Sequence, residues 1–300
     1  MTEHHITTPH GTVAVVDYGG DGPGVLLLHG GGRTLADWGL VRPHVRGRRV
    51  VAADLRWHGF SSDEGDVSLE ANADDAEAII DALGLDNPVI AGHSLGGMVA
   101  AVYAARHPAS PGVVNLDGHG IGTPDQYEGI SAEELQTFRN EIEQLQNEHL
   151  AQDASGDDAW HEAYVSKIKS DYGAEIDASV VDALAVRSFV RDHDGTWYLR
   201  PNPRHVALLQ PVLKSLRMFD IYRAVECPLV IYHSTRPEPW LPPDAAKVTG
   251  AYQRGLARDL KALESEHPNV RVRMLDATHF MIFEVPEKVA RDILSLTPDV

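Results

Sequence analysis

The chain has a single cysteine among 300 residues, Cys227, which excludes an intrachain disulfide framework. Cys227 opens the apolar run CPLVIY, where a small buried residue is expected rather than a nucleophile. Basic residues are also scarce, with 26 lysines and arginines against 44 acids and a net charge of −18. This charge argues against nucleic acid or an anionic membrane as a partner. The expected partner is a small-molecule substrate, and a homodimer stays open.

Hydrophobic targeting segments are also missing. The N-terminal stretch MTEHHITTPHG has neither a basic region nor an apolar core, so no signal peptide is predicted. No apolar stretch approaches the roughly 20 residues that are needed to cross a bilayer. The sequence therefore predicts a cytoplasmic protein.

Metal and nucleotide motifs are absent as well. The chain has 16 histidines, but it contains no H-E-x-x-H and no Cys/His cluster with ligand spacing. The G-K-[ST] ending of a phosphate-binding loop is missing, as is a G-x-G-x-x-G that opens a helix. We therefore expect no metal ion and no cofactor.

The first third of the chain alternates apolar, β-branched runs with segments of helical pattern. The runs at 25–28, 50–54, 89–91 and 113–116 are typical of strands buried on both faces. Residues 34–45 are expected to form a helix that Pro43 shortens or kinks, and residues 69–83 a helix that Gly84 ends. This order predicts an α/β protein whose mostly parallel central sheet is flanked by helices.

The alternation stops after Asp117. Strand signals disappear until about residue 216, and residues 121–183 hold fifteen acids and three bases. Strands return at 228–232 and 270–275, with helices expected at 244–266 and 286–296. We predict a core at 1–118 and 217–300 and an inserted helical cap, or lid, at 119–216. An extra helical layer without a gating role is the alternative.

The sequence Gly92-His93-Ser94-Leu95-Gly96 follows a strand and precedes an Ala-rich helix. This context predicts a serine on a sharp turn, with its hydroxyl exposed and the N–H of Leu95 free at a helix start. The flanking glycines leave room that a tight turn requires. A serine hydroxyl is a poor nucleophile at neutral pH, so Ser94 needs a base, an acid and oxyanion donors.

Candidates for the donors and the base follow other strands. The sequence His29-Gly30-Gly31-Gly32 comes directly after the run at 25–28, and its glycines let backbone N–H groups point into a cleft. Gly31 is the preferred donor, together with Leu95, and Gly32 is the second choice. The base is expected on a loop after the last strand, where the sequence supplies His279.

Four motifs together resemble the α/β-hydrolase fold superfamily over nearly the whole chain: LLLHGGG (26–32), DLRWHGFSS (54–62), GHSLGG (92–97) and DATHF (276–280). Within it, the chain is similar to cap-bearing esterases, lactonases and prolyl aminopeptidase-like hydrolases. The resemblance implies that Ser94 is the nucleophile and His279 the base, with the Gly31 and Leu95 amides as the oxyanion hole. Haloalkane dehalogenases and epoxide hydrolases carry aspartate at the position of Ser94, which counts against their chemistries.

The chain departs from the family pattern at two positions. Trp57 replaces the first glycine of the usual R-G-x-G, and Arg236 stands where the triad acid usually follows the strand at 228–232. Arginine cannot accept a hydrogen bond from a histidine. Some α/β-hydrolases carry the acid after an earlier strand, and Asp117 fits that place. Glu238 is the alternative acid, and a site with no functional acid is the third reading.

The expected function is a serine hydrolase that cleaves a small carboxylic ester or lactone through an acyl-enzyme. An aminopeptidase or amide hydrolase of the prolyl aminopeptidase type is the alternative, because an acidic cap suits a cationic amine. A ligand-binding receptor and a non-hydrolytic enzyme on the same fold stay open. The expected substrate-pocket residues are Gly32, Trp240 and Phe280, with Trp160, Trp197 and Met281 as further candidates.

Overall fold

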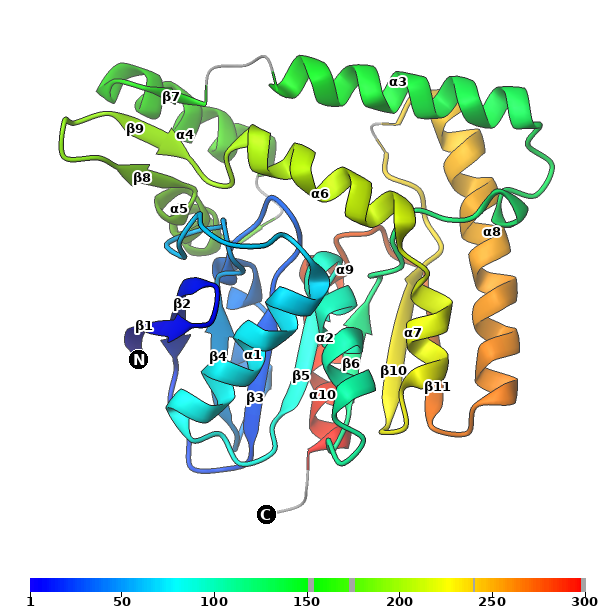
Figure 1. The fold of residues 1–300 in the computed structure, drawn as a ribbon, viewed down its shortest axis with the longest axis horizontal. Coiled ribbons are helices and arrows are strands. Elements are labelled where there is room, and N and C mark those ends of the chain that lie inside the picture. The colour runs from blue at the N-terminus through cyan, green and yellow to red at the C-terminus, as the bar shows by residue number, and fades with distance from the viewer. Residues whose placement is uncertain (151–153, 173–175, 240, 298–300) are drawn as a thin grey trace.

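The centre of the molecule is an eight-stranded sheet with the strand order β1-β2-β4-β3-β5-β6-β10-β11 (Figure 1). The computed structural model describes residues 1–150, 154–172, 176–239 and 241–297. The first two strands are antiparallel to their neighbours, and the remaining six run parallel. The strands are β1 (Thr2–Thr8), β2 (Gly11–Asp17), β3 (Gly24–Leu28), β4 (Arg49–Ala53), β5 (Val89–His93), β6 (Val113–Leu116), β10 (Leu229–Ser234) and β11 (Val270–Leu275).

Helices cover both faces of this sheet, as the sequence predicts for strands with continuous apolar runs. One face carries α1 (Leu69–Leu83), α2 (Leu95–Arg106), α7 (Met218–Ala224) and α8 (Pro243–Glu266). The other carries α9 (Met281–Glu284), α10 (Pro286–Leu296) and the 3₁₀ helix η1 (Leu35–Gly39). Each face therefore has its own buried apolar cluster, and the predicted α/β architecture is confirmed.

The insert between β6 and α7 lies along one edge of the sheet (Figure 1). Its helices are η3 (Pro124–Gln126), α3 (Ala132–Leu150), α4 (Asp158–Tyr172), α5 (Ala178–Arg187) and α6 (Pro203–Ser215). It also holds a small sheet of order β7-β9-β8, formed by β7 (Ser155–Gly156), β8 (Phe189–Arg191) and β9 (Trp197–Leu199). The expectation that this stretch lacks strands was wrong, because strands of two or three residues are too short to give a periodic signal.

One local expectation also needs correction. Residues 34–45 do not form one helix but two short 3₁₀ helices, η1 and η2 (Arg42–His44), since Pro43 has no N–H to continue a helical ladder. The N-terminal residues 2–8 form β1, which pairs with β2. None of the described helices is both long enough and apolar enough to span a bilayer.

The parallel strands bring their carboxyl ends to one edge of the sheet, where sites in open α/β sheets form. Ser94 follows β5, Asp117 follows β6, and His279 lies four residues beyond β11. Three residues that are distant in the sequence thus reach the same edge because of the strand order.

Candidate active site

Ser94 lies on a strained turn between β5 and α2. Its backbone has φ 51° and ψ −115°, a conformation that a non-glycine residue adopts only when its surroundings enforce it. A Cβ on Gly92 would lie 2.0 Å from the Gly96 carbonyl oxygen, and one on Gly96 would lie 2.3 Å from the carbonyl oxygen of Leu28. The glycines therefore allow the close backbone approach that holds Ser94 at the edge of the sheet.

Asp117 reaches the ring of His279. Its Oδ2 lies 2.7 Å from His279 Nδ1, and Asp117 itself has a left-handed backbone with φ 58°. The backbone N–H and the hydroxyl of Ser234 donate to the two Asp117 oxygens at 2.9 and 2.8 Å. Ser234 ends β10, so the strand end where the family usually carries the acid here holds the relocated carboxylate in place.

The protonation of this pair follows from its surroundings. Burial raises the pKa of Asp117, but the hydrogen bond to His279 and the charge of that ring outweigh burial and hold the pKa well below its usual range. An ionised carboxylate only accepts, so in the neutral His279 ring the proton lies on Nδ1 and Nε2 is the acceptor. Burial lowers the pKa of His279, but the hydrogen bond and charge of Asp117 outweigh it and give a net rise.

The alternative acid Glu238 makes a different contact. Its Oε1 accepts from the backbone N–H of His279 at 2.9 Å rather than from the ring. Burial raises the pKa of Glu238. Arg236 pairs with Glu284 at the surface. Of the two candidate acids, the structure therefore brings Asp117 to the imidazole and Glu238 to the backbone.

His93 is a site residue to which the sequence assigned no role. Its Nε2 donates to the carbonyl oxygen of His279 at 2.8 Å, and the two rings lie 4.8 Å apart. Burial lowers the pKa of His93 to about 3, so this ring is neutral at pH 7. His93 thus ties the loop of His279 to the end of β5. It is the variable position of the G-x-S-x-G motif, so the motif gave no signal for it.

Two further histidines position the glycine loop after β3. His29 Nδ1 lies 2.7 Å from the carbonyl oxygen of Gly30, and its Nε2 accepts from the N–H of Leu55 at 2.9 Å. His58 Nδ1 lies 2.9 Å from the carbonyl oxygen of Arg56. Burial lowers the pKa of each of these two histidines to about 3, so both rings are neutral.

The same hydrogen bonds distinguish Gly31 from Gly32 as the candidate oxyanion donor in this loop. The N–H of Gly32 donates to His58 Nε2 at 3.0 Å, so this N–H is already engaged. Among the described residues, no acceptor takes the N–H of Gly31 or that of Leu95. Gly31 is therefore the better placed of the two glycines, and Gly32 serves to hold the loop.

Two cavities open beside the serine turn. The Ser94 cavity, of about 380 Å³, is lined by Ser94, Asp117, His119, His233 and His279 among others. The Gly31 cavity, of about 340 Å³, is lined by Gly31, Gly32, Leu95 and Trp57, and by residues of α4, α5 and α6. The insert thus forms part of the wall beside Gly31.

The departure at Trp57 has a local explanation. Trp57 has a left-handed backbone with φ 67°, the region that favours the glycine of the family pattern. Its Nε1 donates to the carbonyl oxygen of Glu64 at 3.1 Å, and its ring packs on His205 with centroids 4.8 Å apart. These contacts hold a large side chain in a strained position on the wall of the Gly31 cavity.

The expected pocket residues divide. Gly32 lines the Gly31 cavity, whereas Phe280 lines neither cavity and has its ring centroid 5.8 Å from that of His279. Trp240 lies outside the described residues. The other three candidates pack into the structure: Trp160 contacts Tyr164 and Phe189, Trp197 stacks on His161, and Met281 is fully buried.

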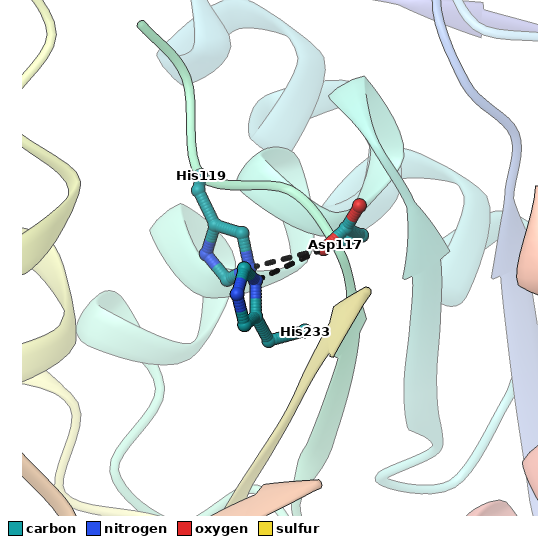
Figure 2. A group of neighbouring side chains, drawn as sticks. All are labelled: Asp117, His119 and His233. Carbon is teal, nitrogen blue, oxygen red and sulfur yellow. Dashed lines mark ion pairs between the residues drawn. The ribbon is translucent and has the colours of Figure 1, made fainter. Parts of the chain in front are cut away.

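The structure also brings together three side chains that could ligate a metal ion, although the sequence predicts no metal site. These are Asp117, His119 and His233 (Figure 2). They come from two neighbouring strand ends 114 or more residues apart, so no short ligand spacing reveals them.

The fold and the serine turn define a hydrolase class. The chain belongs to the alpha/beta hydrolase family, whose model matches residues 25–292. It is similar to protein phosphatase methylesterase 1 of Bos taurus, with 33% identity over 137 residues, or 43% of this chain and 34% of that protein. The match therefore spans about a third of the relative's length.

Solved structures show the same fold over nearly the whole chain. E-2-(acetamidomethylene)succinate hydrolase has 22% identity and a TM-score of 0.68, with 98% of each chain covered. The thioesterase domain from the curacin biosynthetic pathway has 18% identity and a TM-score of 0.69, with 98% of this chain and 99% of that chain covered.

Proposed function

We propose that the protein is a serine hydrolase that cleaves a small carboxylic ester or lactone through an acyl-enzyme. The observation that carries this proposal is the 2.7 Å contact between Asp117 and His279 Nδ1, in a cavity that Ser94 also lines. A buried carboxylate, an imidazole that it orients through Nδ1 and a serine on a strained turn are the parts that acyl transfer requires.

The steps follow from the protonation state. His279 Nε2 takes the proton of the Ser94 hydroxyl while the oxygen attacks the substrate carbonyl. Asp117 keeps the ring in the Nδ1–H form and stabilises the imidazolium. The N–H groups of Gly31 and Leu95 donate to the oxyanion as charge develops. The imidazolium then protonates the leaving alcohol, and water attacks the acyl-enzyme with His279 again as base.

The surroundings support a small substrate. The two cavities of about 340 and 380 Å³ open beside the consecutive residues Leu95 and Ser94, which suits one part of the substrate on each side of the scissile bond. We propose that residues 119–216 act as a lid, since their helices line the Gly31 cavity. The similarity to a methylesterase supports ester chemistry.

A fluorophosphonate probe tests the nucleophile directly. Labelling at Ser94, located by mass spectrometry of the digested protein, is expected in the wild type and absent in Ser94→Ala. A folded wild-type protein that the probe does not label would favour a receptor on this fold.

A substrate panel then tests the reaction class. It compares p-nitrophenyl esters, lactones and aminoacyl amides with the wild type and Ser94→Ala. Faster turnover of esters or lactones is expected. A preference for aminoacyl amides would replace the ester proposal with an aminopeptidase, and products other than those of hydrolysis would exclude both.

A further inference from the structure

Two buried histidines, His119 and His233, face Asp117 (Figure 2). His119 follows Asp117 by two residues. His233 lies on β10, the strand that pairs with β6, and the register that sets Tyr232 beside Leu116 brings it level with Asp117. Both histidines are at least 91% buried. The sheet itself therefore sets the spacing of these three side chains.

The spacing fits a small divalent ion. His119 Nε2 lies 3.5 Å and His233 Nδ1 lies 3.6 Å from Asp117 Oδ1, and all three atoms lie within 4.8 Å of one another. Zinc binds histidine nitrogen and carboxylate oxygen at about 2.0–2.2 Å, which sets neighbouring tetrahedral ligands about 3.3–3.6 Å apart. Two of the three separations already match this value.

The hydrogen bonds of His233 turn a lone pair toward the carboxylate. Its Nε2 lies 3.0 Å from the carbonyl oxygen of Gln253, which can only accept, so Nε2 carries the proton. In the neutral ring, Nδ1 is then the acceptor, and it is buried without a hydrogen-bond partner among the described residues. A ring N–H held by a backbone carbonyl is also the usual second contact of a metal-binding histidine.

His119 differs from His233, because its Nε2 lies 3.1 Å from the carbonyl oxygen of Tyr232, which can only accept. In the neutral ring without an ion, Nε2 therefore carries the proton and donates it to this oxygen. An ion bound at Nε2 would move the ring proton to Nδ1, which lies 3.1 Å from the Tyr222 hydroxyl, whose oxygen can accept it. Metal ligation by His119 therefore requires only this change of tautomer.

We propose that Asp117, His119 and His233 form a binding site for a divalent transition-metal ion of the zinc type, and that an ion bound there inhibits the enzyme. Imidazole and carboxylate are ligands that zinc accepts, and three protein ligands leave a position for water. All three residues line the Ser94 cavity, which gives an ion a route to the site. The ion engages the carboxylate charge that would stabilise the His279 imidazolium, so the inhibitory part rests on the proposed function.

Metal binding is tested without reference to activity. The EDTA-treated full chain is titrated with Co²⁺, and the visible d–d absorption bands are followed. One ion per chain with tetrahedral band intensity is expected. His119→Gln and His233→Gln should each weaken binding at least about 10–100-fold, the range already seen for loss of an outer contact to a metal ligand.

His107→Gln is the matched control. His107 is a half-buried histidine whose Nε2 lies 3.7 Å from Glu77, and it caps the far end of α2 from Ser94. This variant should bind Co²⁺ as the wild type does. Zinc-edge X-ray absorption of the wild type needs no variant, and it should show two imidazoles at about 2.0–2.1 Å.

Inhibition is measured separately with Zn²⁺ and a substrate that the panel identifies. Saturating Zn²⁺ should lower kcat at least about tenfold, since loss of the acid's function in a triad costs on the order of 10⁴-fold. Absence of one-to-one binding, a shell without two imidazoles, or unchanged affinity in both variants would overturn the site. Binding that is lost in the variants but leaves wild-type kcat unchanged would overturn only the inhibitory role.

Discussion

Two pairs of buried histidines lie on opposite sides of Ser94, and their hydrogen bonds differ. On the glycine-loop side, both ring nitrogens of His29 and of His58 have backbone partners at 2.7–3.0 Å. On the acid side, His233 Nδ1 is unpartnered among the described residues, and His119 Nε2 faces oxygens at 3.1 and 3.5 Å.

The difference separates two uses of the same residue type. A neutral ring with one donor and one acceptor can join two backbone groups, and the first pair does this for the loop that carries Gly31. The second pair turns its inner nitrogens toward a carboxylate. Buried polar groups are nearly always satisfied, so a pair that is not fully satisfied points to a ligand or to chemistry.

Removing the charge at the centre of the acid side should have the largest effect. Asp117→Asn is expected to lower kcat by a factor on the order of 10⁴, because the amide no longer fixes the Nδ1–H form of His279. Steady-state kinetics on the best ester of the panel measures this. Asp276→Asn, an exposed aspartate three residues before His279, is the control and should keep wild-type kcat.

Near wild-type turnover in Asp117→Asn would remove this residue from the mechanism. The contrast between the two histidine pairs would then lose its functional meaning, because His119 and His233 would surround a carboxylate without a catalytic role.

Changes in the glycine loop should lower kcat less than Asp117→Asn, and only when they remove the N–H of Gly31. Gly31→Pro deletes that donor and should lower kcat by about 10²–10³-fold, or about 2.7–4 kcal/mol. Gly31→Ala keeps it, and the added Cβ would meet only the Leu95 side chain at 3.8 Å. The alanine variant should therefore retain most activity. Equal losses in both variants, with unchanged thermal melting, would show that the N–H has no special role.

The buried neutral histidines His29, His58 and His93 should make stability depend on pH. The pKa of His29, His58 and His93 is about 3 in the folded protein against 6.5 ordinarily, because burial disfavours the charged ring. The unfolded chain therefore binds more protons between these values, and the free energy of unfolding falls as pH drops below 6.5. Each ring contributes up to about 1.4 kcal/mol per pH unit. His279, whose pKa is raised, acts in the opposite direction and only above pH 6.5.

Urea unfolding at pH 7, 6 and 5 checks this slope above the range where most carboxylates titrate. His58→Asn removes one ring and keeps an acceptor for the Gly32 N–H. The free energy of unfolding of this variant should therefore change less steeply with pH, by the amount that corresponds to one bound proton. A wild-type stability that is flat from pH 7 to 5 would mean that these rings are protonated in the folded state.

Much of the site could be predicted from the sequence, because its glycine motifs occur where the backbone conformation or a close backbone contact excludes a side chain. The glycines around Ser94 are required by backbone approaches near 2 Å, and Gly84 by a left-handed helix end, so residue type and geometry are linked. His279 was predictable from its place after the last strand. Its contact with Asp117 is one of the alternatives that the sequence leaves open, since only the sheet brings residues 162 positions apart together.

The supporting histidines were not predictable in the same way. His58, His119 and His233 act through partners that tertiary structure supplies, and a lone histidine in a sequence carries no periodic or spacing signal. The engagement of Gly32 by His58 likewise depends on a contact across 26 positions. Such residues can be recognised only when the donors and acceptors around each ring are counted.

Glu238 should give the smallest effect and the sharpest test of the acid side. Glu238→Gln keeps an oxygen that can accept from the His279 N–H, so kcat should fall by less than about tenfold, or 1.4 kcal/mol. The lost charge helps to raise the pKa of His279, so the acid limb of the activity profile should move to lower pH. A kcat loss as large as that of Asp117→Asn would make Glu238 the orienting acid. The small change with a shifted limb would instead show that the loop carboxylate tunes the base while Asp117 orients it.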